Sequence, residues 1–512
     1  MDGDRIEDAI EVLAAVRELP LDDPLRQRVQ RAVDGLVKDG QRQRRADRRR
    51  RTAEADRAVL AGAATAAPER AEGVPVVAPT AERATPGQTG TDERVTPGQT
   101  RTDGRATPGQ TRRDRRCYTC RARYRSVDVF YHALCPECAD LHRRHRDART
   151  DLTGRTAVVT GGRVKIGFQV ALKLLRDGAD VTVVTRFPAD AARRYAAEPD
   201  AAAWRSSLRV LGADLRDPRQ VLDLAQRVAD RYPRLDILVN NAAQTVRRPD
   251  WAYQPLVAAE VLAARDPIGR FAVESVPGYH PGRTLPGWSA AITGPAGAAI
   301  TGPAGGGVLG PAGGHVLGPG GGDVLGEGDG VVVAAASAGP TDATGALPDP
   351  AARNSWTARL GEIDPVELLE VQLVNVVAPF LLVDRLRAAL TAPGPGRRYV
   401  VNVTGREGWF AGGGGGPAGH PHTAVTKAAL NMLTRVGAAD LARRDVHMCG
   451  VDTGWVTDEN PAPIRARRAA TGWRPPLDVV DAAARIYQPV VRGEAGLPVH
   501  GVLLKNFAVV PW

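Results

Sequence analysis

Hydrophobic and polar positions alternate between two patterns along most of the chain after residue 155. Short apolar runs typical of buried strands are followed by stretches of about a dozen residues with apolar positions at helical spacing. The predicted strands span 156–160, 181–185, 208–211, 235–239, 399–404, 446–451 and 502–504. The predicted helices span 166–176, 189–204, 218–231, 365–390, 422–441 and 476–491. This alternation predicts an α/β fold with a doubly wound parallel sheet over residues 151–512.

The first 60 residues have a different pattern, which predicts a basic helical segment (1–60). Apolar positions recur at helical spacing over residues 4–19, Pro20 ends that helix, and a second helix begins near Asp23 and Pro24. It continues into residues 41–51, of which seven are arginine. Such a run fits contact with nucleic acid or another polyanion. A solvated helix face or a basic tail is the favoured interpretation, because no aromatic side chains are interleaved for base stacking.

Two further segments lack the pattern of a packed fold. Residues 61–112 contain three copies of TPGQT separated by charged residues, and this composition predicts a disordered linker. Residues from about 275 to 350 contain Gly/Pro-rich octads such as ITGPAGAA and VLGPAGGH. A regular octad can form a small β-roll, but few large side chains are present to be buried. We therefore expect a flexible surface insertion in the sheet domain.

The net charge and the lack of an apolar segment near the start of the chain argue against an exported or membrane-spanning protein. The formal net charge is +10, and arginine is concentrated in the first 150 residues. The chain opens Met-Asp-Gly-Asp-Arg without a following apolar region, and no run reaches the roughly 18 apolar residues of a membrane span. We expect a cytoplasmic protein that does not contact a membrane.

Four of the five cysteines form a compact motif in residues 113–150. Its spacing is CxxC, fourteen residues, CxxC, formed by Cys117, Cys120, Cys135 and Cys138. In a chain without export signals this pattern predicts a metal site rather than disulfides, and four thiolates complete a tetrahedral Zn²⁺ shell. A closed shell stabilises folding rather than catalysing a reaction, so we expect a zinc-ribbon-like module with structural Zn²⁺.

The stretch TGGRVKIG (160–167) joins the first predicted strand of the sheet domain to its first helix. Glycines in such a turn let the backbone approach a pyrophosphate, and the helix N-terminus supplies N–H donors. Strand, glycine turn and helix together predict the opening unit of a Rossmann fold.

Several motifs after this turn resemble the short-chain dehydrogenase/reductase family. TGGRVKIG is similar to the family's TGxxxGxG, with Lys165 in place of the middle glycine, and NNAA (240–243) is similar to its NNAG. The resemblance implies a dinucleotide cofactor, a small-molecule carbonyl or alcohol substrate, and homo-oligomers. It implies catalytic roles for Asn375 and for Lys427, which matches the lysine of the YxxxK motif. The cofactor-binding residues that it implies are Gly161, Gly162, Arg163, Ile166, Gly167, Arg186, Asp214, Asn241, Ala242, Lys427 and Gly454.

The choice between NADP and NAD follows from the residue after the second predicted strand. An acid at this place accepts the ribose hydroxyls of NAD, whereas a basic residue suits the 2′-phosphate of NADP. Here Arg186 follows Thr185, and Arg163 lies in the glycine turn. NADP(H) is therefore favoured over NAD(H), although Arg186 can also be an ordinary surface arginine at a strand end.

The active-site pattern departs from that of the family. Thr423 stands where the family has its tyrosine, and Gly405, preceded by Thr404, stands where it has its serine. A threonine hydroxyl is a poor proton donor at neutral pH, whereas a histidine titrates near 6.5. His422 is the main substitute, with a helix cap as the equally weighted alternative. His420 is a weaker candidate for the proton, and Arg406 and Glu407 are candidates for substrate contact.

Two main functions remain open from the sequence, beside a third and weaker hypothesis in which the basic front end binds nucleic acid. The first is an NADP(H)-dependent oxidoreductase in which Lys427, Asn375, His422, Thr423 and Thr404 arrange protons. The second is a catalytically inactive NADP(H)-binding scaffold or sensor, which the missing tyrosine and serine favour.

Overall fold

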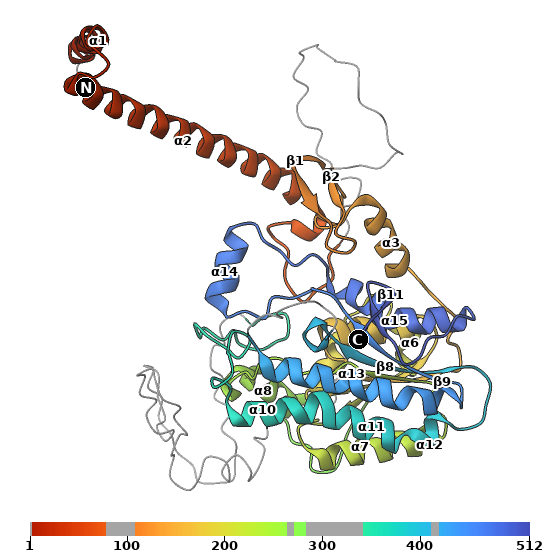
Figure 1. The fold of residues 1–512 in the computed structure, drawn as a ribbon. Helices are drawn as coiled ribbons and strands as arrows, with labels where there is room; N and C mark the ends of the chain where they lie inside the picture. The colour runs from red at the N-terminus through yellow and green to blue at the C-terminus, as the bar shows by residue number, and fades with distance from the viewer. Residues whose placement is uncertain (1–2, 78–107, 264–270, 283–340, 411–418) are drawn as a thin grey trace, which may run out of the picture.

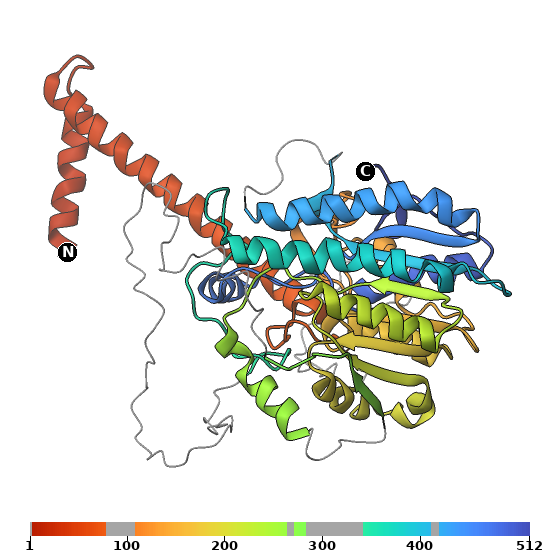
Figure 2. The ribbon, with the colours of Figure 1, turned by 90° about the horizontal axis from the view of Figure 1, so that it is seen from below.

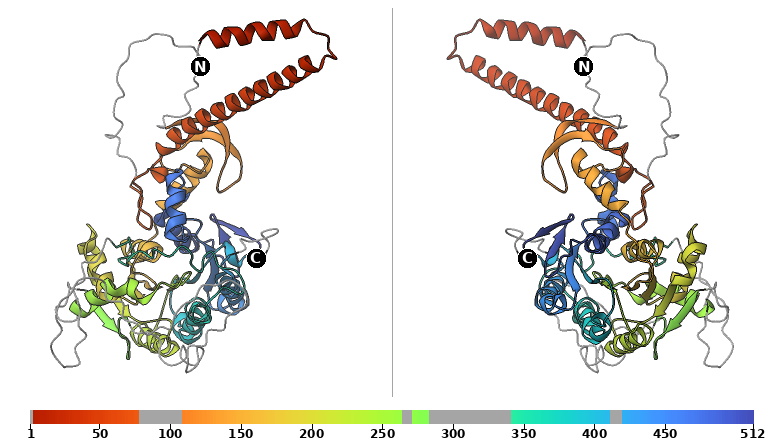
Figure 3. Two further views of the ribbon diagram at one scale, coloured as in Figure 1. Left: turned by 90° about the vertical axis from the view of Figure 1, so that its left-hand side faces the viewer. Right: turned by 90° about the vertical axis from the view of Figure 1, so that its right-hand side faces the viewer.

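The computed structural model describes residues 3–77, 108–263, 271–282, 341–410 and 419–512. A helical arm at the N-terminus leads into a small two-stranded module, which sits on a larger α/β body (Figure 1). Two side views show the arm extending away from the body, with the small module between them (Figure 3).

The body is built on a nine-stranded sheet in the order β11-β10-β9-β8-β6-β3-β4-β5-β7. Neighbouring strands are parallel except for the antiparallel pair β10 and β11. The strands are β3 Thr156–Thr160, β4 Asp180–Thr185, β5 Leu208–Gly212, β6 Ile237–Asn240, β7 Ala272–Ser275, β8 Arg398–Thr404, β9 Val446–Asp452, β10 Leu503–Lys505 and β11 Ala508–Val510. The predicted doubly wound parallel sheet is confirmed.

Helices cover both faces of this sheet. Helices α4 and α15 pack together on one face, while α7, α11 and α13 lie along the other (Figure 2). The helices of the body are α4 Lys165–Arg176, α5 Pro188–Ala196, α6 Ala201–Trp204, α7 Pro218–Arg231, α8 Gln254–Ala263, α10 Pro365–Gln372, α11 Ala378–Arg385, α12 Arg387–Leu390, α13 Pro421–Ala442, α14 Ala462–Ala470 and α15 Val479–Glu494.

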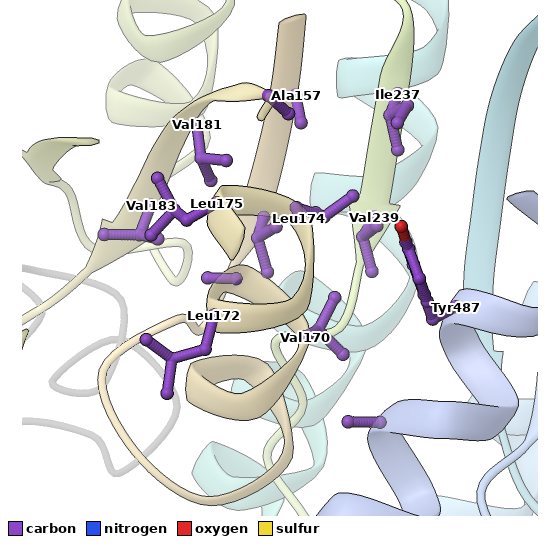
Figure 4. Packing of buried hydrophobic residues seen from close by; sticks show 14 of the residues in the cluster. Ala157, Val170, Leu172, Leu174, Leu175, Val181, Val183, Ile237, Val239 and Tyr487 are labelled. Carbon is purple, nitrogen blue, oxygen red and sulfur yellow. The ribbon is translucent and has the colours of Figure 1, made fainter. Parts of the chain in front are cut away.

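Helix α4 shows why the chain folds in this way. Val170 and Leu174 lie four residues apart, so both side chains project from one face of the helix. They pack against Val239 of the sheet and Tyr487 of α15 (Figure 4). This buried apolar face holds the N-terminus of α4, and with it the glycine turn, against the edge of the sheet.

The structure corrects several predicted boundaries. The helix expected over 189–204 is divided into α5 and α6, and Pro199, which lacks a backbone N–H, lies between them. The helix expected over 365–390 contains a π-helical turn at Leu373–Val377. Elements α8, β7, α14 and β11 were not predicted, because their short segments lack a clear period. The repeated octads of the expected insertion (275–350) lie outside the described residues, whereas residues 341–350 pack on the body.

The arm consists of α1 Gly3–Arg17 and α2 Pro24–Ala61, where Asp23 caps the N-terminus of α2. Helix α2 has no buried residue, so the arginine run 41–51 is part of a solvated helix. Its contact with a polyanion stays a prediction.

The expected disordered linker (61–112) is wrong at both ends, while residues 78–107 lie outside the described residues. Ala63 and Thr65 are buried, and the N–H groups of Ala64 and Thr65 donate to the carbonyls of Val129 and Phe130, both at 2.9 Å. At the other end, strand β1 already begins at Gly109. Main-chain pairing with the cysteine module and burial of small side chains order these ends.

The cysteine module contains β1 Gly109–Arg116, β2 Arg123–Val127 and α3 Pro136–Arg146. Its core joins the body, because Tyr131 and Leu134 of the module share one apolar cluster with Val456 and Leu477.

One helical stretch of the described residues, Pro365–Arg385, is long and apolar enough to cross a membrane by length and composition alone. It packs against α7 and α13 in the body, as a core helix does.

Candidate functional site

A cavity of about 1210 Å³ opens at the carboxyl edge of the sheet. The glycine turn, the loops after β4, β5, β6, β8 and β9, and the first turns of α13 line it. Because these strands are parallel, their carboxyl ends meet at one edge, which is where α/β sheets bind ligands. The cavity therefore contains the regions to which the sequence assigned cofactor and chemistry.

The glycine turn at the start of α4 has a backbone that side chains would disrupt. Gly161 has φ +70°, and a Cβ on Gly167 would collide with the carbonyl oxygen of Gly161. A Cβ on Gly162 would lie 2.7 Å from Cβ of Val183, so Gly162 serves packing and does not line the cavity. Lys165 has φ +53°. The backbone at Lys165 is thus left-handed, a conformation that glycine adopts freely, and a side chain there costs about 1 kcal/mol.

Asn241, which follows β6, is hydrogen-bonded to the start of this turn. Its side-chain Nδ2 donates to the carbonyl of Thr160 at 3.0 Å. The backbone N–H groups of Asn241 and Ala242 both donate to Oγ1 of Thr160, at 3.0 Å each. Asn241 and Ala242 line the cavity together with Gly161, Ile166 and Gly167.

The two arginines expected at the cofactor phosphate differ in their bonding. Arg163 is buried, and its Nη1 donates to Asp190 Oδ2 at 2.7 Å and to the carbonyl of Thr344 at 2.6 Å. The guanidinium of Arg186 lies over the ring of Tyr253 at 4.8 Å and has no carboxylate partner among the described residues. Within the described residues Arg186 is therefore a cation without a carboxylate partner at the end of β4, whereas Arg163 is paired with Asp190.

Asp214 and Gly454 both line the cavity. The carboxylate of Asp214 is paired with Arg216, whose Nη2 lies 2.7 Å from Oδ2, and this arginine holds the pKa of Asp214 below its usual value against the effect of burial. Gly454 has φ +77°, and its N–H donates to Asp452 Oδ1 at 2.8 Å.

Lys427 is buried and lines the cavity. Its Nζ donates to the carbonyl of Val403 at 2.9 Å. Burial lowers the pKa of Lys427 to about 8, and the negative charges of Glu407 and Asp452 oppose that shift. Thr404 also lines the cavity, and its Oγ1 donates to the carbonyl of Lys427 at 3.5 Å.

Of the two histidines at the start of α13, the structure places the weaker candidate, His420, at the cavity and the main candidate, His422, away from it. His420 and Thr423 line the cavity, but His422 does not. His422 is buried beside Glu367, with Nε2 3.9 Å from its Oε1. His420 stacks on Trp356 with ring centroids 4.0 Å apart, and its Nδ1 is buried without a hydrogen-bond partner among the described residues. Burial lowers the pKa of His420, while Glu407 raises it.

Asn375 sits on the π-helical turn and does not line the cavity. Its Oδ1 accepts from the N–H of Gln244 at 2.8 Å, and its Nδ2 donates to the carbonyl of Gln244 at 2.9 Å. Asn375 thereby positions the loop after β6, which forms part of the cavity wall.

The four cysteines of the module converge as their spacing predicts. Their Sγ atoms all lie within 4.8 Å of one another, and those of Cys120 and Cys135 are 3.7 Å apart. A tetrahedral Zn²⁺ shell with Zn–S bonds of about 2.3 Å separates its sulfurs by about 3.8 Å. A disulfide would need about 2.05 Å, so the arrangement fits a metal site.

Comparison of sequences identifies relatives of the body. The family described as "short chain dehydrogenase" matches residues 155–260. An uncharacterized protein, R665 of Acanthamoeba polyphaga mimivirus, is 28% identical over 395 residues, covering 73% of this chain and 71% of that protein. This match is longer than residues 151–512, so it includes part of the chain before the Rossmann domain. A putative daunorubicin C-13 ketoreductase, DnrU of Streptomyces sp. (strain C5), is 37% identical over 106 residues, which are 19% of this chain and about a third (34%) of that enzyme.

Solved structures with a similar arrangement include a short chain dehydrogenase from Burkholderia cenocepacia J2315 in complex with NADP. It is 21% identical, with a TM-score of 0.40 over 69% of this chain and 97% of that one. An NADPH-bound carbonyl reductase from chicken fatty liver is 14% identical, with a TM-score of 0.40 over 70% of this chain and all of that one (100%). The family match rests on residues 155–260, which contain the glycine turn and the NNAA motif. Residues 155–260, which open the body, are thus similar to the short-chain dehydrogenase/reductase family.

Proposed function

We propose that this protein is an NADP(H)-dependent oxidoreductase that acts on a small carbonyl or alcohol substrate. The observation that carries the proposal is that one cavity is lined by the glycine turn, by Arg186 and by the buried Lys427. A volume of about 1210 Å³ has room for a dinucleotide and a small substrate.

The glycine turn and Arg186 would hold the cofactor. The turn presents backbone N–H groups at the N-terminus of α4, which favours a pyrophosphate. Arg186 has no carboxylate partner among the described residues, so its guanidinium is available to a 2′-phosphate. When bound, NADPH would supply the hydride.

Proton handling belongs to the residues around Lys427. The cavity wall includes Lys427, Glu407, His420, Thr404 and Thr423, and the charge of Glu407 acts on both Lys427 and His420. A pKa of about 8 leaves Lys427 mostly protonated at neutral pH, so its ammonium can stabilise negative charge that develops on a carbonyl oxygen. His420, rather than His422, lines the cavity and is the better candidate for holding or releasing a proton.

An inactive NADP(H)-binding scaffold is the second candidate function. Thr423 and Gly405 favour it, because a threonine hydroxyl is a poor proton donor at neutral pH and glycine has no side-chain hydroxyl to orient a substrate. We further propose that the four cysteines hold a structural Zn²⁺, which their closed donor set suits.

The proposal is tested by titrating the purified protein with NADPH and NADH and following the nicotinamide absorbance with a panel of aldehydes and ketones. We expect tighter binding of NADPH than of NADH, and Arg186→Ala should weaken NADPH binding on the order of 10- to 100-fold while leaving NADH nearly unchanged. Lys427→Ala should abolish turnover. NADPH binding without turnover would favour the scaffold, and equal affinity for both cofactors would refute the assignment of Arg186.

A further inference from the structure

The cysteine module is fixed to the Rossmann body by buried polar contacts. The hydroxyl of Tyr131 donates to Asp481 Oδ1 at 2.6 Å. The guanidinium of Arg146 donates to both carboxylate oxygens of Asp478, at 2.6 and 2.8 Å. Both aspartates are buried, and they lie at the start of α15. Because buried, charge-assisted contacts of this kind have a defined geometry, the module occupies one place on the body.

The cysteine loop, defined as residues 117–121 around the first two cysteines of this module, forms part of the cavity wall. Tyr118, Thr119 and Arg121 line the cavity. The hydroxyl of Tyr118 accepts a hydrogen bond from the backbone N–H of Trp455 at 2.9 Å. The metal-binding loop is therefore in direct contact with the segment that follows β9.

This contact lies at the same end of the cavity as Lys427. Thr404, whose hydroxyl donates to the backbone of Lys427, is the register partner of Asp452 across β8 and β9. Asp452 in turn accepts from the N–H of Gly454, the residue before Trp455. Tyr118 therefore borders the cavity beside the end of β9, next to the strand end that carries Thr404.

The lining of the cavity is strongly cationic. It includes ten basic side chains, and six of them lie within 4.0 Å of a carboxylate oxygen. The other four have no carboxylate partner in the part of the chain that the structure describes: Arg121, Arg186, Arg406 and Lys427. Arg186 lies at the end of β4 and Lys427 donates to Val403, which leaves Arg121 and Arg406 without an assigned ligand.

We propose that Arg121, presented by the cysteine loop, binds an anionic group of the substrate, a carboxylate or a phosphate. The inference rests on the proposed function and deepens it by naming the substrate class. An exposed guanidinium without a carboxylate partner matches such oxyanions through paired N–H donors. The cysteine module thereby selects the substrate of the Rossmann domain. A metal bound by Cys117 and Cys120 would fix the loop that carries Arg121.

The test compares probes that differ only in charge. Dissociation constants of 4-carboxybenzaldehyde, 4-formylphenyl phosphate and the neutral 4-formylbenzamide are measured by tryptophan fluorescence, because Trp356, Trp409 and Trp455 line the cavity. We expect the full chain to bind at least one anionic probe on the order of 10- to 100-fold more tightly than the neutral probe. The two anionic arms distinguish a carboxylate from a phosphate.

Arg121→Ala should remove this preference and leave zinc content and NADPH affinity unchanged. Arg144→Ala is the matched control, because Arg144 is an exposed arginine of the same module that does not line the cavity. Equal affinity of the wild-type protein for charged and neutral probes, or a preference that survives Arg121→Ala, would overturn the inference. The titrations are made with and without NADP⁺, so a failure of cofactor binding would count against the proposed function alone.

Discussion

The carboxylate of Glu407 occupies the space into which a side chain at Gly405 would extend, since a Cβ built on Gly405 collides with Oε2 of Glu407. The family resemblance places a serine hydroxyl at position 405. Here a carboxylate fills that space and raises the pKa of Lys427 against the effect of burial. A carboxylate therefore lies beside the lysine at the place where the resemblance leads us to expect a hydroxyl.

Glu407→Gln should move the alkaline limit of activity to lower pH. The pKa of Lys427 is about 8, lowered from its ordinary value by burial and held up by Glu407 and Asp452. Removal of the Glu407 charge lowers this pKa further, so the ammonium form is lost at a lower pH. The measurement is kcat/KM as a function of pH, with Glu362→Gln, an exposed carboxylate outside the cavity, as the control. An alkaline limb that does not move in Glu407→Gln would show that Glu407 does not act on Lys427.

Lys165→Gly and Lys165→Ala should differ in stability. Lys165 has φ +53°, a conformation that glycine adopts at little cost and alanine does not. Both variants remove the ammonium that lies 3.5 Å from Glu459, so the loss of this half-exposed ion pair is common to them. We expect Lys165→Gly to have the larger free energy of unfolding, by about 1 kcal/mol in urea denaturation. Equal stability of the two variants would contradict a left-handed backbone at this position.

The sequence predicts the central strands well because both of their faces are buried. Val158 and Val183 belong to continuous apolar runs, which a parallel sheet covered on both faces requires. Strand β7 was missed because its residues, Ala272–Ser275, are half-buried or exposed and include a glutamate. Local pattern is a weak signal for such an edge strand.

The residues of the candidate site could be predicted only where a sequence motif fixes their position in the fold. Lys427 lies in the expected cavity, but His422 does not, since successive residues of a helix point about 100° apart and Thr423 takes the inward position. That Tyr118 and Arg121 line the cavity could not be predicted from the sequence. Their position depends on packing between segments more than 300 residues apart.

Gly167→Ala should abolish NADPH binding. A Cβ at position 167 would overlap the carbonyl oxygen of Gly161 and approach Nδ2 of Asn241, so the turn that is expected to hold the pyrophosphate has to move. Overpacking of this kind costs about 1–3 kcal/mol, which unfolding experiments would detect beside the loss of binding. Gly35→Ala is the control, because a Cβ at Gly35 on the solvated helix α2 meets no atom within 4 Å. Retained NADPH affinity in Gly167→Ala would place the cofactor elsewhere.

Zinc should be present at one ion per chain, and its removal should destabilise the region around the cysteine module. The four Sγ atoms lie within 4.8 Å of one another, whereas Cys449 is buried in β9, far from them in sequence and outside this cluster. Cys135→Ser is expected to lose the ion and to lower the temperature of unfolding, while Cys449→Ala should keep the ion. Metal content is measured by elemental analysis of the purified full chain, and the order of the module by hydrogen exchange of Tyr118, Tyr131 and the segment from Trp455 to Asp481. Because Tyr131 and Arg146 connect the module to α15, faster exchange should spread from β1 and β2 to the start of that helix. Faster exchange confined to the module, or wild-type protein without metal, would show that the cysteines do not support the contact with the body.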